Sequence, residues 1–579
     1  MFARNTRRQA SAISGLSAHL FKARVHSRNT TRSYSQKTSN SPSGNQGWIG
    51  PTVALVGTFT LASAAYLYTN KEPAVKQIPA RSMKVAVAVE ESRVDDTLSK
   101  EQNREALSTQ HAQVRNMSDN PGVYAWGANS HRVVDPDSSE TIIRSPHRIR
   151  YFEGRYLRDI KLSETSGAAV TDSGDLVQWG KGFSESEFQP VPTLKGKNLV
   201  SISLSRDRII ALSSGGNVYS IPISKSDQES GPKPRETSWI PFRSPRSHIS
   251  YRPLTPQLGL GEKVTSIASG LEHVLLLTSA GRVFSAAAAT EYYPSRGQLG
   301  VLGLTWATRP KGPVDRCHEI TSLKNFKIQK IASGDFHSLL LDKDGRVFVF
   351  GDNSFGQLGI GYDPTTPVID TPKQLPMKGL YSSKGWATRV TNVAAGGYTS
   401  FLTIDAQRAE GSPDDKSDLS PKPASVSVDT WSFGRGIHGA LGTGKWTHIQ
   451  DRPSKVKALS GLSEYDEKAQ KVLPIHLVQI AAGATHAAAV LGNNSHLRTS
   501  KRSSVADTTW GQDTLWWGGN ESLQLGTGKR SNIPTPTHIL PPPDIVTSAN
   551  PDESRFQILP GQQRIECGRQ VTAVYSVKS

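Results

Sequence analysis

Residues 328–361 read IQKIASGDFHSLLLDKDGRVFVFGDNSFGQLGIG, and this segment decides the fold. Two apolar runs flank Asp344 and Gly345, a pair that favours a tight hairpin turn because glycine adopts a positive φ without a side-chain clash. The second run is rich in aromatic residues, ends at Gly351 and leads into a Gly-Gln-Leu-Gly loop. The segment therefore predicts one small antiparallel sheet of short strands.

The same pattern recurs along the chain, and a fixed repeat of this kind predicts sheets that bury a continuous core between neighbours. In three copies a histidine stands three residues after a glycine and opens an aliphatic strand; these are His273, His337 and His486. The three histidines occupy the same place in separate repeats, so they cannot converge on one metal ion. Six copies begin near residues 157, 199, 264, 328, 390 and 478.

The two ends of the repeat region supply a seventh copy. Residues 122–127, GVYAWG, form the second half of a repeat, and residues 564–577, RIECGRQVTAVYSV, form a first half. Pairing of the C-terminal strands with the N-terminal strand closes a ring and removes the exposed strand edges that promote aggregation. We therefore predict an all-β fold, a seven-bladed β-propeller closed by its N- and C-terminal strands.

These copies resemble the regulator of chromosome condensation repeats, which form seven-bladed β-propellers. The resemblance covers residues 121–579, and its most specific marks are residues 332–359, AAGATHAAAV at residues 481–490, and Trp-Gly pairs at Trp126, Trp179 and Trp517. It implies that the three histidines are structural and hydrogen-bonded within their own blades. The repeat glycines mark positions where strands bend or approach closely; they are Gly270, Gly334, Gly396, Gly483 and Gly568.

Three stretches interrupt the repeats, near residues 224–261, 406–428 and 492–509. They are rich in Ser, Pro, Lys and Arg, which predicts exposed loops that serve as contact surfaces.

The N-terminal sequence predicts a mitochondrial targeting signal. The first acidic residue is Glu72, whereas arginine and lysine recur among many Ser and Thr residues before it. An Arg-rich, Ser-rich and acid-free leader is typical of a mitochondrial transit peptide. The segment from Arg32 to Ser35 resembles a matrix-processing site, so we expect a transit peptide over residues 1–34, followed by a short polar tail over residues 35–47. A basic arm that binds nucleic acid or a nuclear import receptor is the alternative.

Residues 48–68, WIGPTVALVGTFTLASAAYLY, carry no charge and have aromatic residues at both ends. A helix of this length spans about 30 Å, the thickness of a bilayer core, so we predict one transmembrane helix. A buried helix, or a continuation of the leader, is the alternative. A polar stalk is expected over residues 69–120, with a short helix near residues 95–112. A leader followed by a stop-transfer helix would leave the repeat region in the intermembrane space. The positive charges after the span favour the matrix instead; they are Lys71, Lys76, Arg81 and Lys84.

The remaining composition excludes several kinds of site. The chain has 579 residues, a formal net charge of +18 and two cysteines, Cys317 and Cys567, neither of which lies in a CxxC pair. A disulfide scaffold and a four-thiolate zinc site are therefore excluded, and part of the positive charge belongs to the predicted leader. No nucleophile stands beside a partnered base. We predict no enzyme activity, no cofactor and no metal.

Three functions fit these features. The combination of transit peptide, transmembrane helix and propeller resembles fungal mitochondrial inner-membrane proteins required for assembly of the cytochrome bc1 complex (complex III). This resemblance implies a non-catalytic scaffold whose partners are complex III subunits or their assembly factors. Guanine-nucleotide exchange on a mitochondrial small GTPase is one alternative, by analogy with the nuclear founding member of the family. RNA or mitoribosome binding through basic loops such as residues 498–502 is the other.

Loops carry most binding functions, and arginine is favoured at protein contacts. The candidate partner-binding residues are therefore Arg243, Arg246, Arg435, Lys445 and Lys529.

Overall fold

The computed structural model describes the repeat region and little of what precedes it. The chain divides into two compact units, residues 1–90 and 91–579, and all described residues belong to the second. The described residues are 109–235, 246–381, 385–408, 426–466, 470–493, 511–542 and 555–578.

The predicted transit peptide, polar tail and transmembrane helix, over residues 1–68, lie outside the described residues, as does the stalk up to residue 108. Within the ranges that the structure describes, no helix is both long enough and apolar enough to cross a bilayer.

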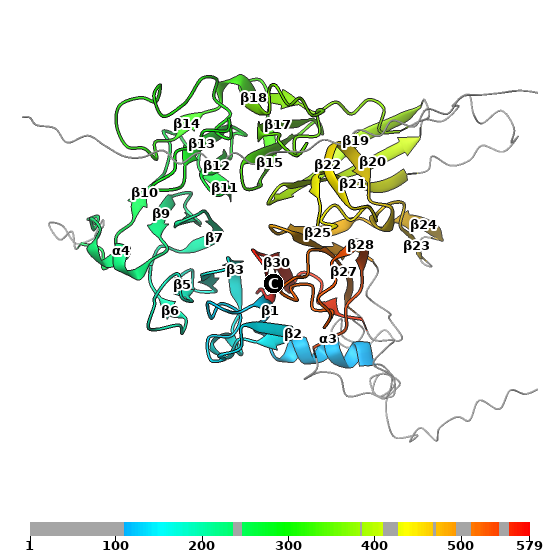
Figure 1. The fold of residues 1–579 in the computed structure, drawn as a ribbon, viewed down its shortest axis with the longest axis horizontal. Coiled ribbons are helices and arrows are strands. Elements are labelled where there is room, and N and C mark those ends of the chain that lie inside the picture. Colours follow the sequence, from blue (N-terminus) through cyan, green and yellow to red (C-terminus); the bar gives the residue numbers. More distant parts are fainter. Residues whose placement is uncertain are drawn as a thin grey trace, which may run out of the picture. The chain divides into compact units, whose positions relative to one another are not determined.

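Seven antiparallel sheets form the blades of a ring in the described part of the chain (Figure 1). Six of them have four strands, and one has a fifth strand beside its four blade strands. Six blades consist of consecutive strands, and the first strand of each contacts the first strand of its neighbours around the centre. The first three of these blades are β3 (Leu157–Leu162), β4 (Gly167–Thr171), β5 (Leu176–Trp179) and β6 (Val191–Pro192); β7 (Leu199–Leu204), β8 (Arg208–Ser213), β9 (Val218–Pro222) and β10 (Arg252–Pro253); and β11 (Val264–Ser269), β12 (His273–Thr278), β13 (Val283–Ala287) and β14 (His318–Glu319).

The next three blades contain the most regular repeats and the longest strands. They are β15 (Ile328–Ser333), β16 (His337–Asp342), β17 (Val347–Asp352) and β18 (Val368–Gln374); β19 (Trp386–Gly396), β20 (Thr399–Arg408), β21 (Val426–Gly436) and β22 (Thr447–Lys455); and β25 (Leu477–Ala482), β26 (His486–Leu491), β27 (Gln512–Gly518) and β28 (Ile533–Thr537).

The seventh blade joins the two ends of the repeat region, which confirms the predicted closure. Its strand order is β30 (Gln563–Cys567), β31 (Val571–Ser576), β1 (Val123–Ala128) and β2 (Ile142–Arg148), from the centre outwards. Val123 pairs with Tyr575, and the register continues to Gly127 opposite Val571. The strands β1 and β31 are buried along their whole length, so closure of the ring is also a packing contact.

The hairpin predicted from the quoted segment is present. Asp342 and Gly345 form the turn between β16 and β17, where Gly345 has a φ of 85° and its N–H donates to the Asp342 carbonyl at 3.2 Å. The strands β16 and β17 are buried at all positions, because each packs between neighbouring blades. This burial explains why they read as continuous apolar runs rather than as alternating ones.

The predicted insertions differ in part from the described structure. The stretch 224–261 includes a short helix, α4 (Lys225–Ser230), and the outer strand β10, so it is not only a loop. Residues 406–408 and 426–428 belong to β20 and β21, whose strands extend beyond the repeat core. Residues 409–425 and 494–510 lie outside the described residues.

A helix precedes the first strand of the propeller. This helix is α3 (Thr109–Asp119), within the last residues of the expected stalk. Most of the helix expected near residues 95–112 lies outside the described residues. Val114 and Met117 are 2 % and 1 % exposed and belong to the core cluster that contains Phe556. Gln113 donates through Nε2 to the Gln557 carbonyl at 2.9 Å.

Smaller elements complete the described fold. They are the 3-10 helices η1 (Arg150–Phe152), η2 (Thr321–Leu323) and η4 (Lys457–Leu459), the hairpin of β23 (Ser463–Asp466) and β24 (Lys471–Pro474), and the short strand β29 (Gln557–Ile558), which pairs with β27.

Candidate interaction face and central cavity

All blades have the same strand order, so the ring has two distinct faces. One face carries the turns from the first to the second strand and the loops from the third to the fourth strand of every blade. We call it the turn face. The opposite face carries the hairpins between second and third strands, such as the one at Gly345, and the connections between blades.

The repeat histidines lie at the turn face and connect neighbouring blades. Nε2 of His273, His337 and His486 lies 2.9, 2.8 and 2.8 Å from the hydroxyl oxygens of Ser338, Ser400 and Thr572, respectively. Each hydroxyl belongs to the next blade of the ring. The hydrogen bonds of these histidines were expected within single blades, and this prediction is wrong because they connect neighbouring blades. We call each of them a histidine bridge.

A second hydrogen bond made by the hydroxyl shows which group is the donor in a histidine bridge. Ser400 Oγ donates to the Gln357 carbonyl at 2.8 Å, and Thr572 Oγ1 donates to the Gln524 carbonyl at 2.6 Å. The hydroxyl proton is used in that bond, so the oxygen accepts from the Nε2–H of His337 or His486. The imidazole is consequently held as the neutral Nε2–H tautomer.

Burial keeps the bridge histidines neutral. The side chains are 0 %, 0 % and 1 % exposed for His273, His337 and His486. Burial lowers the pKa of His273 to about 3, of His337 to about 4 and of His486 to about 3, because an imidazolium is poorly solvated there.

The repeat glycines allow the blades to approach one another. A β-carbon on Gly568 would lie 2.1 Å from the Leu162 carbonyl oxygen of the next blade, and one on Gly396 would lie 2.2 Å from that of Ala482. A β-carbon on Gly334 would lie 2.2 Å from Cε1 of its own His337. A β-carbon on Gly270 or Gly483 would lie 2.4 or 2.6 Å from a carbonyl oxygen of the next blade, so all five positions are restricted by packing around the centre.

The candidate partner-binding residues lie in different surroundings. Arg243 is outside the described residues. Arg246 is exposed and forms a β-bridge with Arg235. Lys445 and Lys529 are exposed in the β21–β22 and β27–β28 loops. These loops lie next to each other on the turn face, since His438 Nδ1 lies 3.5 Å from Glu521 Oε1.

Arg435 belongs to a series of stacked side chains that crosses the turn face. The Arg435 guanidinium lies 4.9 Å from the ring centre of Phe355, and the ring of Phe355 lies 5.1 Å from that of Tyr398. Tyr398 lies 6.0 Å from Phe336, over which Arg296 stacks at 4.2 Å. We call these five residues the aromatic–arginine ladder. Only Arg435 was predicted from the sequence, because the other four members come from four separate loops and turns.

The ladder holds Arg435 ready for a negative partner. Cation–π contact fixes the guanidinium above Phe355 while the side chain stays partly exposed. Arg296 is already paired with Asp352 at 3.0 Å, whereas Arg435 forms no ion pair with any described residue. Burial raises the pKa of Tyr398, with a further contribution from Asp335, so its phenol stays protonated at neutral pH.

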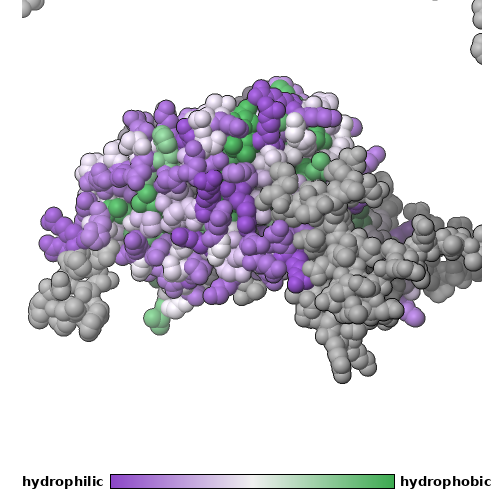
Figure 2. Space-filling view, turned by 90° about the horizontal axis from the view of Figure 1, so that it is seen from below, coloured by the Kyte–Doolittle hydropathy of each residue, from purple (hydrophilic) through white to green (hydrophobic). Residues whose placement is uncertain are grey.

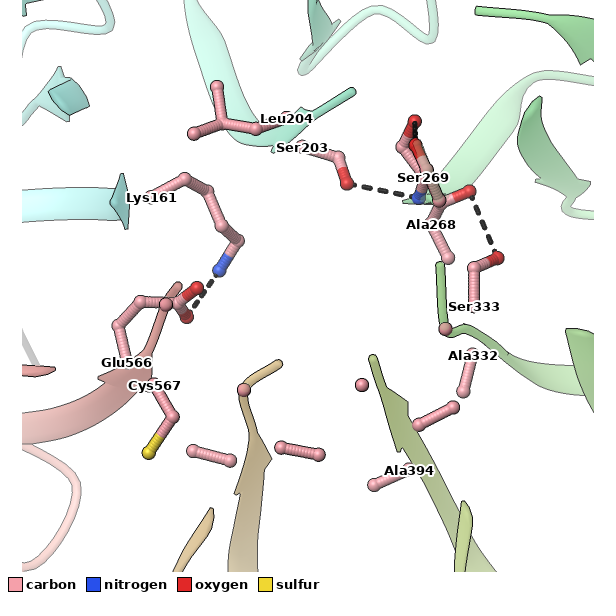
Figure 3. A pocket seen from close by; sticks show the side chains of 18 of the residues that line it. Lys161, Ser203, Leu204, Ala268, Ser269, Ala332, Ser333, Ala394, Glu566 and Cys567 are labelled. Atoms are coloured by element: carbon pink, nitrogen blue, oxygen red, sulfur yellow. Dashed lines mark hydrogen bonds and ion pairs between the residues drawn. The ribbon is translucent and has the colours of Figure 1, made fainter. Parts of the chain in front are cut away.

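A cavity of about 680 Å³ lies at the centre of the ring and is lined by the first strand of every blade (Figure 3). Its polar groups are largely used between neighbouring strands. Ser203 Oγ accepts from the Ser269 N–H at 3.0 Å, and Lys161 Nζ lies 2.6 Å from Glu566 Oε2 (Figure 3). Burial opposes the charge of Lys161, but Asp159 and Glu566 outweigh it and raise its pKa. The lining therefore joins the blades to one another.

One ion pair crosses the cavity entrance at the turn face. Arg569 Nη2 lies 2.9 Å from both carboxylate oxygens of Asp335. Arg569 belongs to the closure blade and Asp335 to the β15–β18 blade, which are not neighbours in the ring. The pair thus connects distant blades directly.

The described residues contain no cluster of three or more His, Cys, Asp or Glu side chains that could hold a metal ion. Both cysteines are free: Cys567 is buried, and Cys317 Sγ donates to the Leu254 carbonyl at 3.0 Å.

The ring, its closure and its histidine bridges define a seven-bladed β-propeller. Family models described as "Regulator of chromosome condensation (RCC1) repeat" match residues 328–357, 344–403 and 429–490.

Known proteins with related sequences include one from mitochondria. The chain is 25 % identical over 437 residues to "Protein FMP25, mitochondrial" of Saccharomyces cerevisiae, in a match that covers 71 % of this chain and 64 % of that protein, which is less than two thirds of its length. It is 24 % identical over 443 residues to the mouse secretion-regulating guanine nucleotide exchange factor, covering 72 % and 79 % of the two chains. The crystal structure of human WBSCR16 has the same fold, with a TM-score of 0.51 and 18 % identity over 79 % of this chain and 99 % of that one.

Proposed function

We propose that this protein is a mitochondrial scaffold that binds other proteins through its turn face. The observation that carries the proposal is the aromatic–arginine ladder, which presents Arg435 in a fixed position without a carboxylate partner among the described residues. Arginine and aromatic side chains dominate the binding energy of protein interfaces. The expected partner surface therefore carries a carboxylate that reaches Arg435 between apolar contacts.

The mitochondrial part of the proposal rests on two features. One is the acid-free, Arg-rich leader, and the other is the similarity to the mitochondrial protein of yeast. We further propose that residues 48–68 anchor the chain in the inner membrane as a single span, with the propeller in either the matrix or the intermembrane space. The client that we propose is the cytochrome bc1 complex during assembly, on the basis of the family resemblance.

The test is affinity purification of the full-length tagged protein from gently solubilised mitochondria, followed by quantitative proteomics. Enrichment of bc1 subunits and their assembly factors over an untagged control is the expected result. Enrichment of mitoribosomal proteins without bc1 subunits would contradict the proposed client and favour the RNA-linked alternative, whose basic residues 498–502 lie outside the described residues.

Guanine-nucleotide exchange is the second candidate, and the similarity to the mouse exchange factor favours it. In this case the turn face or the opposite face would bind a small GTPase and accelerate release of its nucleotide. The direct measurement is release of a fluorescent guanine nucleotide from purified mitochondrial GTPases. Acceleration at catalytic amounts of the full-length protein would support exchange, and an unchanged release rate for every GTPase would exclude it for that set.

A further inference from the structure

We infer that part of the turn face docks on the surface of an anionic lipid bilayer. The part concerned is formed by the β13–β14 and β21–β22 loops and is defined by six side chains: Leu302, Trp306, Lys311, Ile437, Lys445 and Trp446. The inference goes beyond client binding and uses different side chains from the aromatic–arginine ladder.

The first observation is the position of the exposed tryptophans. Trp306 and Trp446 are each 55 % exposed, whereas Trp126, Trp179 and Trp516 are completely buried. In the described part of the chain these are the two tryptophans exposed to this degree, and both lie in loops between third and fourth strands. They therefore lie on the same face of the ring. Tryptophan is enriched at the interface between membrane and water.

The second observation is what surrounds each tryptophan. Leu302 is 76 % exposed in the same loop as Trp306, and Ile437 is 40 % exposed beside Trp446, across the pairing of Gly436 with Thr447. The Arg309 guanidinium stacks 3.5 Å from the ring centre of Trp306. Both loops thus combine an apolar tip with cations; the exposed lysines are Lys311 and Lys445.

The third observation is the distribution of charge on the turn face. The β1–β2 and β5–β6 loops, on the other side of the ring, carry more exposed carboxylates than lysines. The carboxylates are those of Asp137, Glu140, Glu185 and Glu187, the last of which lies 3.2 Å from Lys225, and the exposed lysine is Lys181. An anionic surface attracts the lysines of the β13–β14 and β21–β22 loops and repels the carboxylates of the β1–β2 and β5–β6 loops. The charge pattern therefore selects one orientation of the face against a bilayer.

A lipid surface fits this arrangement better than a protein partner does. The two tryptophan loops belong to blades separated by the whole β15–β18 blade, so their tips are isolated projections and not one central pocket. Binding energy in protein interfaces concentrates in a packed central cluster, whereas the bilayer surface accepts separate apolar side chains wherever they reach it. Seen from the rim, the surface is otherwise mainly hydrophilic, with scattered apolar side chains (Figure 2).

The experiment compares the full-length protein in two kinds of nanodisc, one of phosphatidylcholine alone and one that also contains phosphatidylglycerol. Hydrogen–deuterium exchange is measured in peptides that cover the β13–β14 and β21–β22 loops. The expected result is slower exchange in both loops only when the anionic lipid is present. Replacing Lys445 by alanine should weaken the association of the face about fivefold, the effect of about one lysine near an anionic surface.

The variant Trp306→Ser/Trp446→Ser should lose the protection and keep the exchange pattern of the buried strands, because both side chains are exposed. Leu260→Ser is the matched control, since Leu260 is fully exposed in the β10–β11 connection on the opposite face. Equal exchange in the two lipid compositions would overturn the inference. Protection that requires added mitochondrial protein and not anionic lipid would also overturn it and assign the loops to a protein partner.

Discussion

Three of the seven junctions between blades carry a histidine bridge, and four do not. In the bridged junctions the histidine faces a hydroxyl of the next blade, as His337 faces Ser400. In the other four, the position of the histidine is taken by Thr399, Val571, Ser166 or Arg208, and the facing positions of the next blades are Ala487, Gly167, Ile209 and Val274. A hydroxyl therefore faces this position only where a histidine donates to it.

The difference shows that histidine and hydroxyl form one unit. A buried hydroxyl without a partner costs stability, so an apolar residue is the better choice where no imidazole is present. The unbridged junctions use other contacts. In the junction after the β7–β10 blade, Ser205 Oγ donates to the Ala288 carbonyl of the next blade at 3.0 Å. Polar and apolar junctions are thus two solutions to the same packing problem.

The largest expected effect comes from removing the junction that closes the ring. Deletion of residues 564–579 removes β30 and β31, exposes the edge of β1 and eliminates the bridge from His486 to Thr572. We expect the truncated protein to lose its cooperative unfolding transition and its propeller to be rapidly proteolysed. A truncated protein with an unchanged melting temperature would contradict the closure.

Acid should disrupt all bridged junctions together. The folded-state pKa values of the three histidines, about 3 to 4, lie below the ordinary value of 6.5, so only the unfolded chain binds protons between these limits. Stability from neutral imidazole is complete above pH 6.5 and falls as the pH decreases towards 4, by about 4 kcal/mol per pH unit if all three titrate.

Denaturant unfolding as a function of pH measures this slope. His337→Gln keeps an N–H donor but removes one titrating group. The part of the slope that comes from the histidines should therefore be about one third smaller in this variant than in the wild type. Carboxylates contribute equally to both proteins and cancel in the comparison. Identical slopes would show that His337 is not a buried neutral group.

Breaking one bridge should have a smaller effect. His337→Ala and Ser400→Ala should each lower the free energy of unfolding by about 2 kcal/mol, and their coupling in a double-mutant cycle should be about 1 kcal/mol or more. The matched control combines His273→Ala with Ser400→Ala, residues that do not share a bridge, and should be additive. Equal coupling in both cycles would refute the pairing.

The smallest effect concerns the ion pair across the cavity entrance. Arg569 and Asp335 are 38 % and 13 % exposed, so water and salt screen the pair. Arg569→Gln should lower stability by about 0.5 kcal/mol at low ionic strength and by less at high salt. Urea unfolding at two salt concentrations tests this, and a large loss that is independent of salt would point to packing and not to charge.

Much of the fold could be predicted from the sequence because each repeat carries its own hairpin turn and apolar strands. The halves at residues 122–127 and 564–577 even predicted the closure. The outer strands β10 and β14 could not be placed, since each pairs through only two residues and leaves no periodic pattern. The packing of the helix α3 against the propeller could not be predicted, because only a few of its residues, such as Val114 and Met117, face the core.

The candidate site was harder to predict. The place of the bridge histidines was recognised, but their partners were expected in the wrong blade, because no local signal tells which strand lies across a junction. The hydroxyls of Ser338, Ser400 and Thr572, each one residue after the equivalent position of its own repeat, were the available signal. Arg569 and Asp335 are 234 residues apart, so their pairing depends wholly on ring closure.

One comparison of variants tests directly whether the turn face recruits the client. Full-length wild type, Arg435→Glu on the turn face and Lys343→Glu on the opposite face are purified from mitochondria in parallel, and client enrichment is measured by quantitative proteomics. Lys343 is exposed in the hairpin between β16 and β17, so the two variants change charge equally. We predict loss of bc1 subunits from Arg435→Glu alone. Retention by Arg435→Glu, with loss in Lys343→Glu, would contradict the claim and place recruitment on the opposite face.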